Sequence, residues 1–272
     1  MNKEEITSNW KTQKSGYEKY WDKFNKTFND LYNLNLKSTD WEASWRNICH
    51  TEMKDESVYY TTSEINGEVK NYNDGDFDSW INDRIDYLMK KLENLVTPST
   101  DYIIELGSGW GRNIIPTCIH FPNTKTLCGE ITEAGRSVTQ KFIDNYNLNI
   151  ETFEFNWCEP TSFINFLKHK APKEIVIFSF HSIEQVTYME IDNILKIIDL
   201  PIKMKWFHIE PCAFQLKVPS NNSGWNQNYI PLLKELETTG KIKINELNPK
   251  GYKSTIHGGT SLEAIDIQWN KI

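Results

Sequence analysis

Residues 102–113 have the sequence Tyr102-Ile103-Ile104-Glu105-Leu106-Gly107-Ser108-Gly109-Trp110-Gly111-Arg112-Asn113. The mostly apolar start predicts a buried strand, and the glycines after it predict a tight turn into a helix over 113–119. Glycine lets a backbone approach a ligand closely, and the first amides of a helix have no partner within it. A strand, a glycine-rich turn and a helix in this order are typical of a nucleotide site. Many α/β proteins have such a turn without binding a ligand there, so the residues that follow must show whether this turn is a cofactor site.

The spacing of the glycines separates two classes of cofactor site. A dinucleotide-binding fingerprint has the form G-x-G-x-x-G, but here the sixth position is Arg112 and the third glycine stands fifth, at Gly111. With Glu105 two positions before the first glycine, the pattern is E-x-G-x-G-x-G. This pattern resembles the first motif of the class I S-adenosylmethionine (SAM)-dependent methyltransferases. In that family the turn wraps the methionine part of SAM, and the acidic residue contacts its ammonium group directly or through water. The resemblance implies these cofactor contacts: Glu105, Gly107, Ser108, Gly109, Gly111 and Arg112.

A second strand over 124–129 ends in Glu130 and Ile131. A carboxylate about 20 residues beyond a glycine turn is placed to accept hydrogen bonds from a ribose diol. A solvated carboxylate at the start of a turn is the alternative. The end of an apolar strand lies at the edge of the sheet where ligands bind, which favours the ribose role. We therefore expect Glu130 and Ile131 to contact the cofactor.

A third strand over 150–155 leads to Asn156 and Trp157. In the family, a side chain after this strand, commonly an aspartate, bonds the adenine amino group while a neighbour packs on the purine. The resemblance gives these roles to Asn156 and Trp157, because an amide oxygen also accepts from an amino group. A capping role for Asn156, ahead of the short helix after Pro160, is nearly as well supported.

The near-continuous apolar run 174–180 predicts a buried parallel strand that ends beside Ser179 and leads into His181. In a doubly wound sheet, ligands bind outside the carboxyl ends of the strands where the strand order reverses. We expect Ser179 to contact the cofactor and His181 to act as general base or to orient the substrate, because histidine has a pKa of about 6.5. A histidine bonded to the backbone is the alternative. Glu184 could hold a substrate amine or complete a capping box.

The last strands complete the predicted sheet. A fifth strand over 204–209 ends in Glu210, whose carboxylate could equally bind a substrate amine or accept a hydrogen bond from a loop. Strands over 241–247 and 261–269 match the antiparallel pair that ends the family's sheet. The resemblance covers 102–272 and implies an α/β fold with a doubly wound, mostly parallel, seven-stranded sheet.

The first 98 residues precede the motif and have no template in the family. Large apolar residues recur at steps of three and four between positions 10 and 32, which predicts an amphipathic helix. We expect residues 1–98 to form an aromatic-rich helical cap, with Tyr20, Trp21 and Trp41 in the substrate pocket, and residues 99–272 to form the SAM-binding core. Packing on the core is the simpler explanation for each aromatic residue. The sequence also predicts a small hairpin over 58–70 and a helix over 77–95.

Composition restricts the partners. The chain has 272 residues, 39% of them hydrophobic, and a net charge of −7 with a pI near 5.5. An acidic protein is a poor partner for a phosphate backbone, so we expect no nucleic acid. The five cysteines form no C-x-x-C pair, and no cluster has metal-ligand spacing, so we expect no metal. The polar N-terminus and the lack of a long apolar run predict a cytoplasmic protein without a membrane span.

Together these patterns predict an enzyme that transfers a methyl group from SAM, leaving S-adenosylhomocysteine (SAH). The run Ser179-Phe180-His181-Ser182 stands where methyltransferases of nucleobase or glutamine amides carry Asn/Asp-Pro-Pro-Tyr/Phe. With the acidic charge, this favours a small molecule or short peptide as acceptor. Aromatic residues and carboxylates suit an amine, so N-methylation is favoured over O-methylation. The alternative is a SAM-binding sensor or partner subunit without activity. Arg112 argues against a dinucleotide-dependent oxidoreductase.

Overall fold

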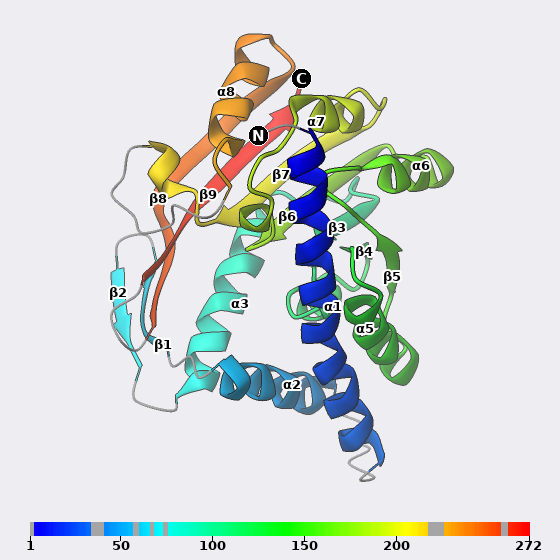
Figure 1. Ribbon diagram of the computed structural model, residues 1–272, viewed down its shortest axis with the longest axis vertical. Coiled ribbons are helices and arrows are strands. Elements are labelled where there is room, and N and C mark those ends of the chain that lie inside the picture. The colour runs from blue at the N-terminus through cyan, green and yellow to red at the C-terminus, as the bar shows by residue number, and fades with distance from the viewer. Residues whose placement is uncertain are drawn as a thin grey trace.

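The computed structural model describes residues 3–33, 41–56, 60–65, 68–72, 76–216, 226–256 and 261–272. Within them, one nine-stranded sheet has helices on both faces (Figure 1). The strands are β1 (Tyr60–Ile65), β2 (Glu68–Asn71), β3 (Tyr102–Leu106), β4 (Lys125–Glu130), β5 (Ile150–Glu154), β6 (Glu174–Phe180), β7 (Lys203–Glu210), β8 (Ile242–Ile256) and β9 (Ser261–Lys271). The helices are α1 (Lys3–Asn33), α2 (Trp41–Glu56), α3 (Phe77–Glu93), α4 (Ile114–His120), α5 (Glu133–Tyr146), α6 (Thr161–Lys170), α7 (Ile191–Ile198) and α8 (Tyr229–Thr238), with 3-10 turns η1 (Ile183–Gln185) and η2 (Ala213–Leu216).

The strand order places the site. The sheet runs β2-β1-β8-β9-β7-β6-β3-β4-β5, and β3 to β7 are parallel to one another while β9, β8, β1 and β2 pair antiparallel. From β3 the chain moves outward through β4 and β5, then returns to the other side of β3 with β6 and continues to β7. The direction of winding therefore reverses between β3 and β6, where a doubly wound sheet binds its ligand.

The alternation of side chains along each strand divides the core into two layers. In β6, Ile175 and Ile177 pack with the face that α6, α7 and α8 cover. Val176 and Phe178 point to the opposite face, which α3, α4 and α5 cover. All seven residues of β6 are buried, since helices lie on both of its faces. This explains the continuous apolar run in the sequence.

The N-terminal segment differs from the expected helical cap, because part of it belongs to the sheet. The predicted hairpin forms as β1 and β2, and β1 pairs with β8. The predicted strand over 241–247 continues to Ile256, which gives β1 a partner: Ile65 lies opposite Tyr252. An edge strand leaves backbone groups unpaired, and pairing with β1 satisfies those of β8. The sheet therefore has nine strands, and the expected seven form the part from β8 to β5.

The first two helices lie against the glycine turn and the helix α5. Figure 1 shows α1 crossing in front of the parallel strands beside α5. The Glu18 carboxylate of α1 accepts from the backbone N–H groups of Glu133 (3.0 Å) and Ala134 (3.2 Å) at the start of α5. In α2, Trp45 Nε1 donates to the carbonyl oxygen of Arg112 (2.9 Å). None of the described helices combines the length and the hydropathy needed to cross a bilayer.

Candidate active site

The glycine turn after β3 is held open by three left-handed residues. Gly107, Gly109 and Gly111 have φ angles of 77°, 57° and 91°, which side chains other than glycine rarely adopt. A Cβ atom on Gly107 would lie 1.7 Å from Ser182 Oγ, so the turn after β3 touches the loop after β6. The two loops meet at the point where the winding of the sheet reverses.

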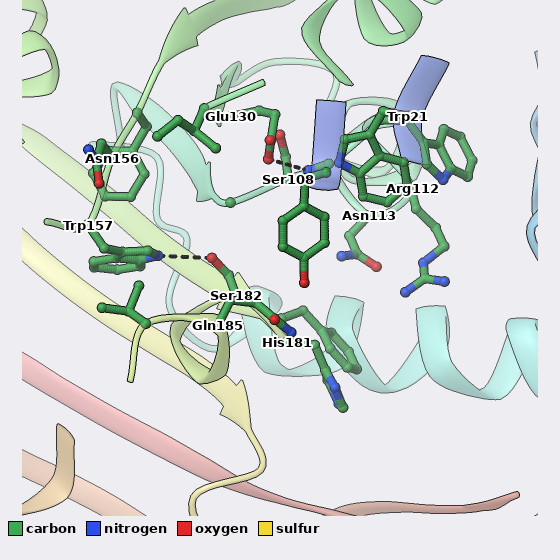
Figure 2. Close-up of a pocket in the computed structure, with 18 of the residues that line it drawn as sticks. Trp21, Ser108, Arg112, Asn113, Glu130, Asn156, Trp157, His181, Ser182 and Gln185 are labelled. Carbon is green, nitrogen blue, oxygen red and sulfur yellow. Dashed lines mark hydrogen bonds between the residues drawn. The ribbon is translucent and has the colours of Figure 1, made fainter. Parts of the chain in front are cut away.

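A cavity opens beside this meeting point. Its empty volume, open solvent at its mouth included, is about 880 Å³. The loops after β3, β4, β5 and β6 line it, together with side chains from α1 and α2 (Figure 2). Ten of the residues expected at the site lie in this lining: Trp21, Gly107, Ser108, Gly109, Arg112, Glu130, Ile131, Asn156, Trp157 and His181.

Glu130 joins the ends of β3 and β4. Its Oε2 accepts from the Gly109 N–H (2.9 Å), and its Oε1 accepts from the N–H (3.0 Å) and the hydroxyl (2.7 Å) of Thr132. The carboxylate therefore fixes the glycine turn. Because a carboxylate has about four acceptor positions, Oε2 retains capacity for a ligand hydroxyl. The ribose role stays a prediction.

Asn156 and Trp157 line the cavity at the end of β5 (Figure 2). Asn156 Oδ1 accepts from the Cys158 N–H (2.8 Å), so the oxygen expected to bind an amino group already holds a turn. Pro160, not Asn156, stands at the N-cap of α6. Trp157 Nε1 donates to Ser182 Oγ (2.9 Å), and this bond joins the β5 and β6 loops.

His181 follows β6 in a left-handed backbone conformation with a φ of 60°. This conformation costs about 1–2 kcal/mol for a residue with a Cβ atom, and such strain concentrates at functional sites. His181 Nδ1 lies 3.2 Å from Glu184 Oε2, and the ring stacks on Phe180. Figure 2 shows the imidazole at the rim of the cavity, on the side opposite Glu130. This approach brings the two ionisable groups together without hydrogen-bond geometry, because Glu184 Oε2 has no hydrogen-bond partner among the described residues.

The order β5-β4-β3-β6-β7-β9-β8, five parallel strands followed by an antiparallel pair, decides the fold class. The fold is that of the class I SAM-dependent methyltransferases. No protein-family model and no curated protein matches the sequence.

Solved structures with a similar fold include several methyltransferases. A SAM-dependent methyltransferase from Aquifex aeolicus matches with 12% identity and a TM-score of 0.47, over 68% of this chain and 89% of that chain. The geranyl diphosphate C-methyltransferase from Streptomyces coelicolor A3(2) matches with 9% identity and a TM-score of 0.49, over 70% and 76% of the chains. The PH0226 protein from Pyrococcus horikoshii OT3 matches with 11% identity and a TM-score of 0.43, over 73% and 92%. At these values the fold assignment rests on the sheet order.

Within this methyltransferase fold, Glu105 does not line the cavity as expected. It lies fully buried behind the glycine turn, where its Oε1 accepts from Asn113 Nδ2 (2.7 Å). Burial raises the pKa of the Glu105 carboxyl to about 8, and the Asn113 hydrogen bond and the charges of Arg84 and Arg112 oppose this only in part. Asn113 stands between Glu105 and the cavity. At this point Asn113, and not Glu105, lines the cavity.

Ser179 and Glu210 are also placed away from the cavity. Both are fully buried, and Glu210 accepts from the Ser179 hydroxyl (2.5 Å) and from the backbone N–H groups of Ser182 (3.1 Å) and Glu184 (3.3 Å). Burial, and next the nearby Glu184 charge, raise the pKa of Glu210 well above its usual value. Of the two roles expected for Glu210, the structure supports the bond to a loop. Ser179 Oγ also bonds His208 Nδ1 (2.8 Å), so it is occupied within the core.

The aromatic residues expected in the substrate pocket divide between cavity and core. Trp21 lines the cavity and touches the glycine turn: a Cβ atom on Gly109 would lie 2.9 Å from its ring. Tyr20 and Trp41 lie outside the lining and pack on the core beneath the helices. Gly111 and Glu184 also lie outside the lining. Glu184 approaches the cavity only as the neighbour of His181, which does line it. Tyr17, one helical turn before Trp21, lines the cavity and was not expected there.

Further lining residues escaped the sequence analysis. Glu52 on α2 accepts from Trp110 Nε1 (3.0 Å) and from Arg112 Nη1 (3.2 Å), which ties α2 to the glycine motif. No spacing in the sequence connects Glu52 with that motif. Asn113 could have been predicted as a lining residue, because it directly follows Arg112 of the motif. Among the described residues, no group of three or more His, Cys, Asp and Glu side chains is arranged to hold a metal ion.

Proposed function

We propose that this protein transfers a methyl group from SAM to a small molecule or short peptide, and that the acceptor atom is a nitrogen rather than an oxygen. One observation carries the proposal. The glycine turn and the strand ends that would hold SAM share one cavity with the strained His181, whose ring lies beside the Glu184 carboxylate. A protein that only bound SAM would need no such pair at the rim.

The residues present fit SAM. The glycine turn provides a backbone surface without side chains, and Glu130 Oε2 can accept from a hydroxyl beside it. Trp157 offers an aromatic ring at the end of β5 (Figure 2). When bound, SAM supplies an electrophilic methyl group. The chain then has to hold an acceptor in line, keep water away and remove a proton.

His181 is the residue that can take the proton. The Glu184 carboxylate lies 3.2 Å from its Nδ1, where a negative charge would stabilise the imidazolium that forms when the ring takes a proton. The Glu184 N–H in turn donates to Glu210, which holds the loop and preserves the left-handed conformation of His181. Glu210 is thus a positioning residue in this proposal.

The lining favours an amine as acceptor. Tyr17 and Trp21 line the cavity with aromatic rings from α1, and Glu52 lines the same cavity with a carboxylate. Aromatic faces and carboxylates attract alkylammonium groups. An amine must lose a proton before it attacks the methyl group, which gives His181 its task.

The first experiment uses methyl-labelled SAM. The purified protein is incubated with it and with a cell extract separated into small-molecule, protein and nucleic-acid fractions. We expect label in the small-molecule or peptide fraction, where mass spectrometry can name the acceptor and the atom. Label only in nucleic acid or large proteins would refute the proposed acceptor class. SAM binding without any label would favour the sensor.

The role of His181 is tested by His181→Ala. We expect SAM affinity to stay within about twofold and methyl transfer to fall by roughly 100-fold or more, the usual contribution of a general base. His120→Ala is the matched control, because His120 lies at the end of α4 outside the cavity lining and pairs with Glu93. Unchanged transfer in His181→Ala would rule out His181 as the base.

A further inference from the structure

Two side chains of the cavity lining present oxygen atoms without donors. The first is Glu52 on α2, whose side chain is buried, with a relative exposure of 5%. Its Oε2 accepts from Trp110 Nε1 and Arg112 Nη1. No described residue donates to its Oε1. Since both donors hold the same oxygen, the carboxylate is fixed with one oxygen available.

The second is Asn113 at the start of α4, which has a relative exposure of 4% and also lines the cavity (Figure 2). Its Nδ2 donates to Glu105 Oε1 (2.7 Å), which orients the amide. Its Oδ1 has no hydrogen-bond partner among the described residues. A buried carbonyl oxygen without a hydrogen bond is costly, and a ligand that donates to Asn113 Oδ1 would remove that cost.

Both available atoms are acceptors, so the ligand must bring the donors. We propose that Glu52 and Asn113 form a subsite for an ammonium group. An ammonium group carries three donors and a positive charge, which suits a carboxylate oxygen and an amide oxygen together. This inference rests on the proposed function for the identity of the ligand. The ammonium group belongs either to the methionine part of the cofactor or to the methyl acceptor.

The charges around the subsite are compatible with a cation. Two arginines lie near it: the Arg112 guanidinium is paired with Glu52 Oε2, and the charge of Arg84 acts on Glu105 behind Asn113. Glu105 lies behind Asn113 and accepts from its amide, which polarises the Asn113 oxygen toward the cavity. The rings of Tyr17 and Trp21 line the same cavity and add a surface that attracts alkylammonium groups.

The carboxylate of the subsite comes from α2, outside the part of the chain that carries the glycine motif. Trp110 and Arg112 of the motif donate to Glu52, and Trp45 of the same helix donates to the Arg112 carbonyl, so three hydrogen bonds join α2 to the motif. Arg112, the sixth residue of the motif, therefore has a structural role in this chain. Arg112 holds the carboxylate of α2 in place and turns its other oxygen to the ligand.

The test compares SAH with its deaminated analogue, which keeps the nucleoside and the carboxylate but has hydrogen in place of the amino group. Isothermal titration calorimetry measures both with wild type and with Glu52→Gln, whose amide oxygen can still accept from Trp110 and Arg112. If the ammonium group is the cofactor's, wild type binds SAH about 10- to 100-fold more tightly than the analogue, as expected for one charge-assisted hydrogen bond. Glu52→Gln then loses this preference while its affinity for the analogue stays the same.

If the ammonium group is the acceptor's, Glu52→Gln binds SAH as wild type does. Phenethylamine, an aromatic amine, then binds the SAH complex of wild type and binds that of Glu52→Gln at least about 10-fold more weakly. Glu174→Gln is the matched control, because Glu174 is a buried, ion-paired carboxylate outside the cavity lining. Asn113→Ala provides a second variant, and melting temperatures verify that each one folds.

The subsite is refuted if Glu52→Gln and Asn113→Ala bind SAH, the analogue and phenethylamine as wild type does. That result would leave the proposed function intact, because SAH would still bind. If wild type binds neither SAH nor its analogue, the proposed function fails instead. Phenethylamine binding that depends on Glu52 would then still support the subsite.

Discussion

Replacing Gly107 by alanine tests the contact between the loops after β3 and β6. The φ of 77° imposes a left-handed conformation on alanine, which costs about 1–2 kcal/mol. The new Cβ atom would lie 1.7 Å from Ser182 Oγ and 2.5 Å from Ser182 Cβ, so the loop has to move. Such overpacking costs a further 1–3 kcal/mol or so. We expect a loss of about 2–5 kcal/mol in the free energy of unfolding.

Gly240→Ala separates the two contributions. Gly240 has a φ of 72°, and a Cβ atom there would meet no atom within 4 Å, so only the conformational cost of about 1–2 kcal/mol remains. Urea unfolding gives the free energy of both variants, and titration with SAH gives their affinities. Gly107→Ala should be the less stable and should lose SAH binding, because Ser182 anchors Trp157. Equal stabilities, or normal SAH binding in Gly107→Ala, would refute the described contact between the loops.

Two further predictions concern buried and helix-capping carboxylates. Glu18→Ala removes the acceptors of two N–H groups at the start of α5, which should lower the free energy of unfolding by about 1 kcal/mol and speed hydrogen exchange in α1. Asp22→Ala is the control, because Asp22 is exposed on the same helix and its loss should change neither quantity. Equal exchange in both variants would contradict this anchoring. Glu105→Gln tests the raised pKa. Between about pH 4.5 and pH 8, the Glu105 carboxyl keeps its proton in the folded protein, where its pKa is about 8, and loses it in the unfolded chain, where its pKa is near 4.5. The stability of wild type due to this group is therefore full below about pH 4.5 and is lost as the pH rises toward 8. Thermal melts should show Glu105→Gln gaining on wild type from pH 5 to 8, and parallel pH curves would disprove the shift.

The sequence allows the parallel core and the glycine turn to be predicted, because both depend on local patterns. The run 174–180 alternates between two helix-covered faces, and continuous apolarity is sufficient to show that. Tyr20 and Trp21 show the limit of periodicity. Both belong to the apolar side of one helix, but only Trp21 reaches the cavity, and that depends on where the helix crosses the sheet.

The depth of a side chain below a loop is equally hard to predict. Glu105 and Glu210 stand at the carboxyl ends of their strands, as expected, yet both lie under the loops that follow. Asn113 covers Glu105, and the N–H groups of Ser182 and Glu184 cover Glu210. Position in a strand therefore predicts the edge of the sheet that a carboxylate occupies. It does not predict whether a ligand can touch it.

The pairing of β1 with β8 delays the completion of the N-terminal fold until the end of the chain has been synthesised. Ile65 of β1 pairs with Tyr252 of β8, which is synthesised much later. The Tyr87 hydroxyl likewise donates to Asp266, 179 residues later in the chain. A ribosome releases the N-terminal part first, so the hairpin emerges with one edge unpaired and remains exposed to wrong partners until β8 arrives. Such distant pairing also slows folding, because a long loop must close first. Loss of β8 and β9 would thus leave the beginning of the chain without a partner as well as its end.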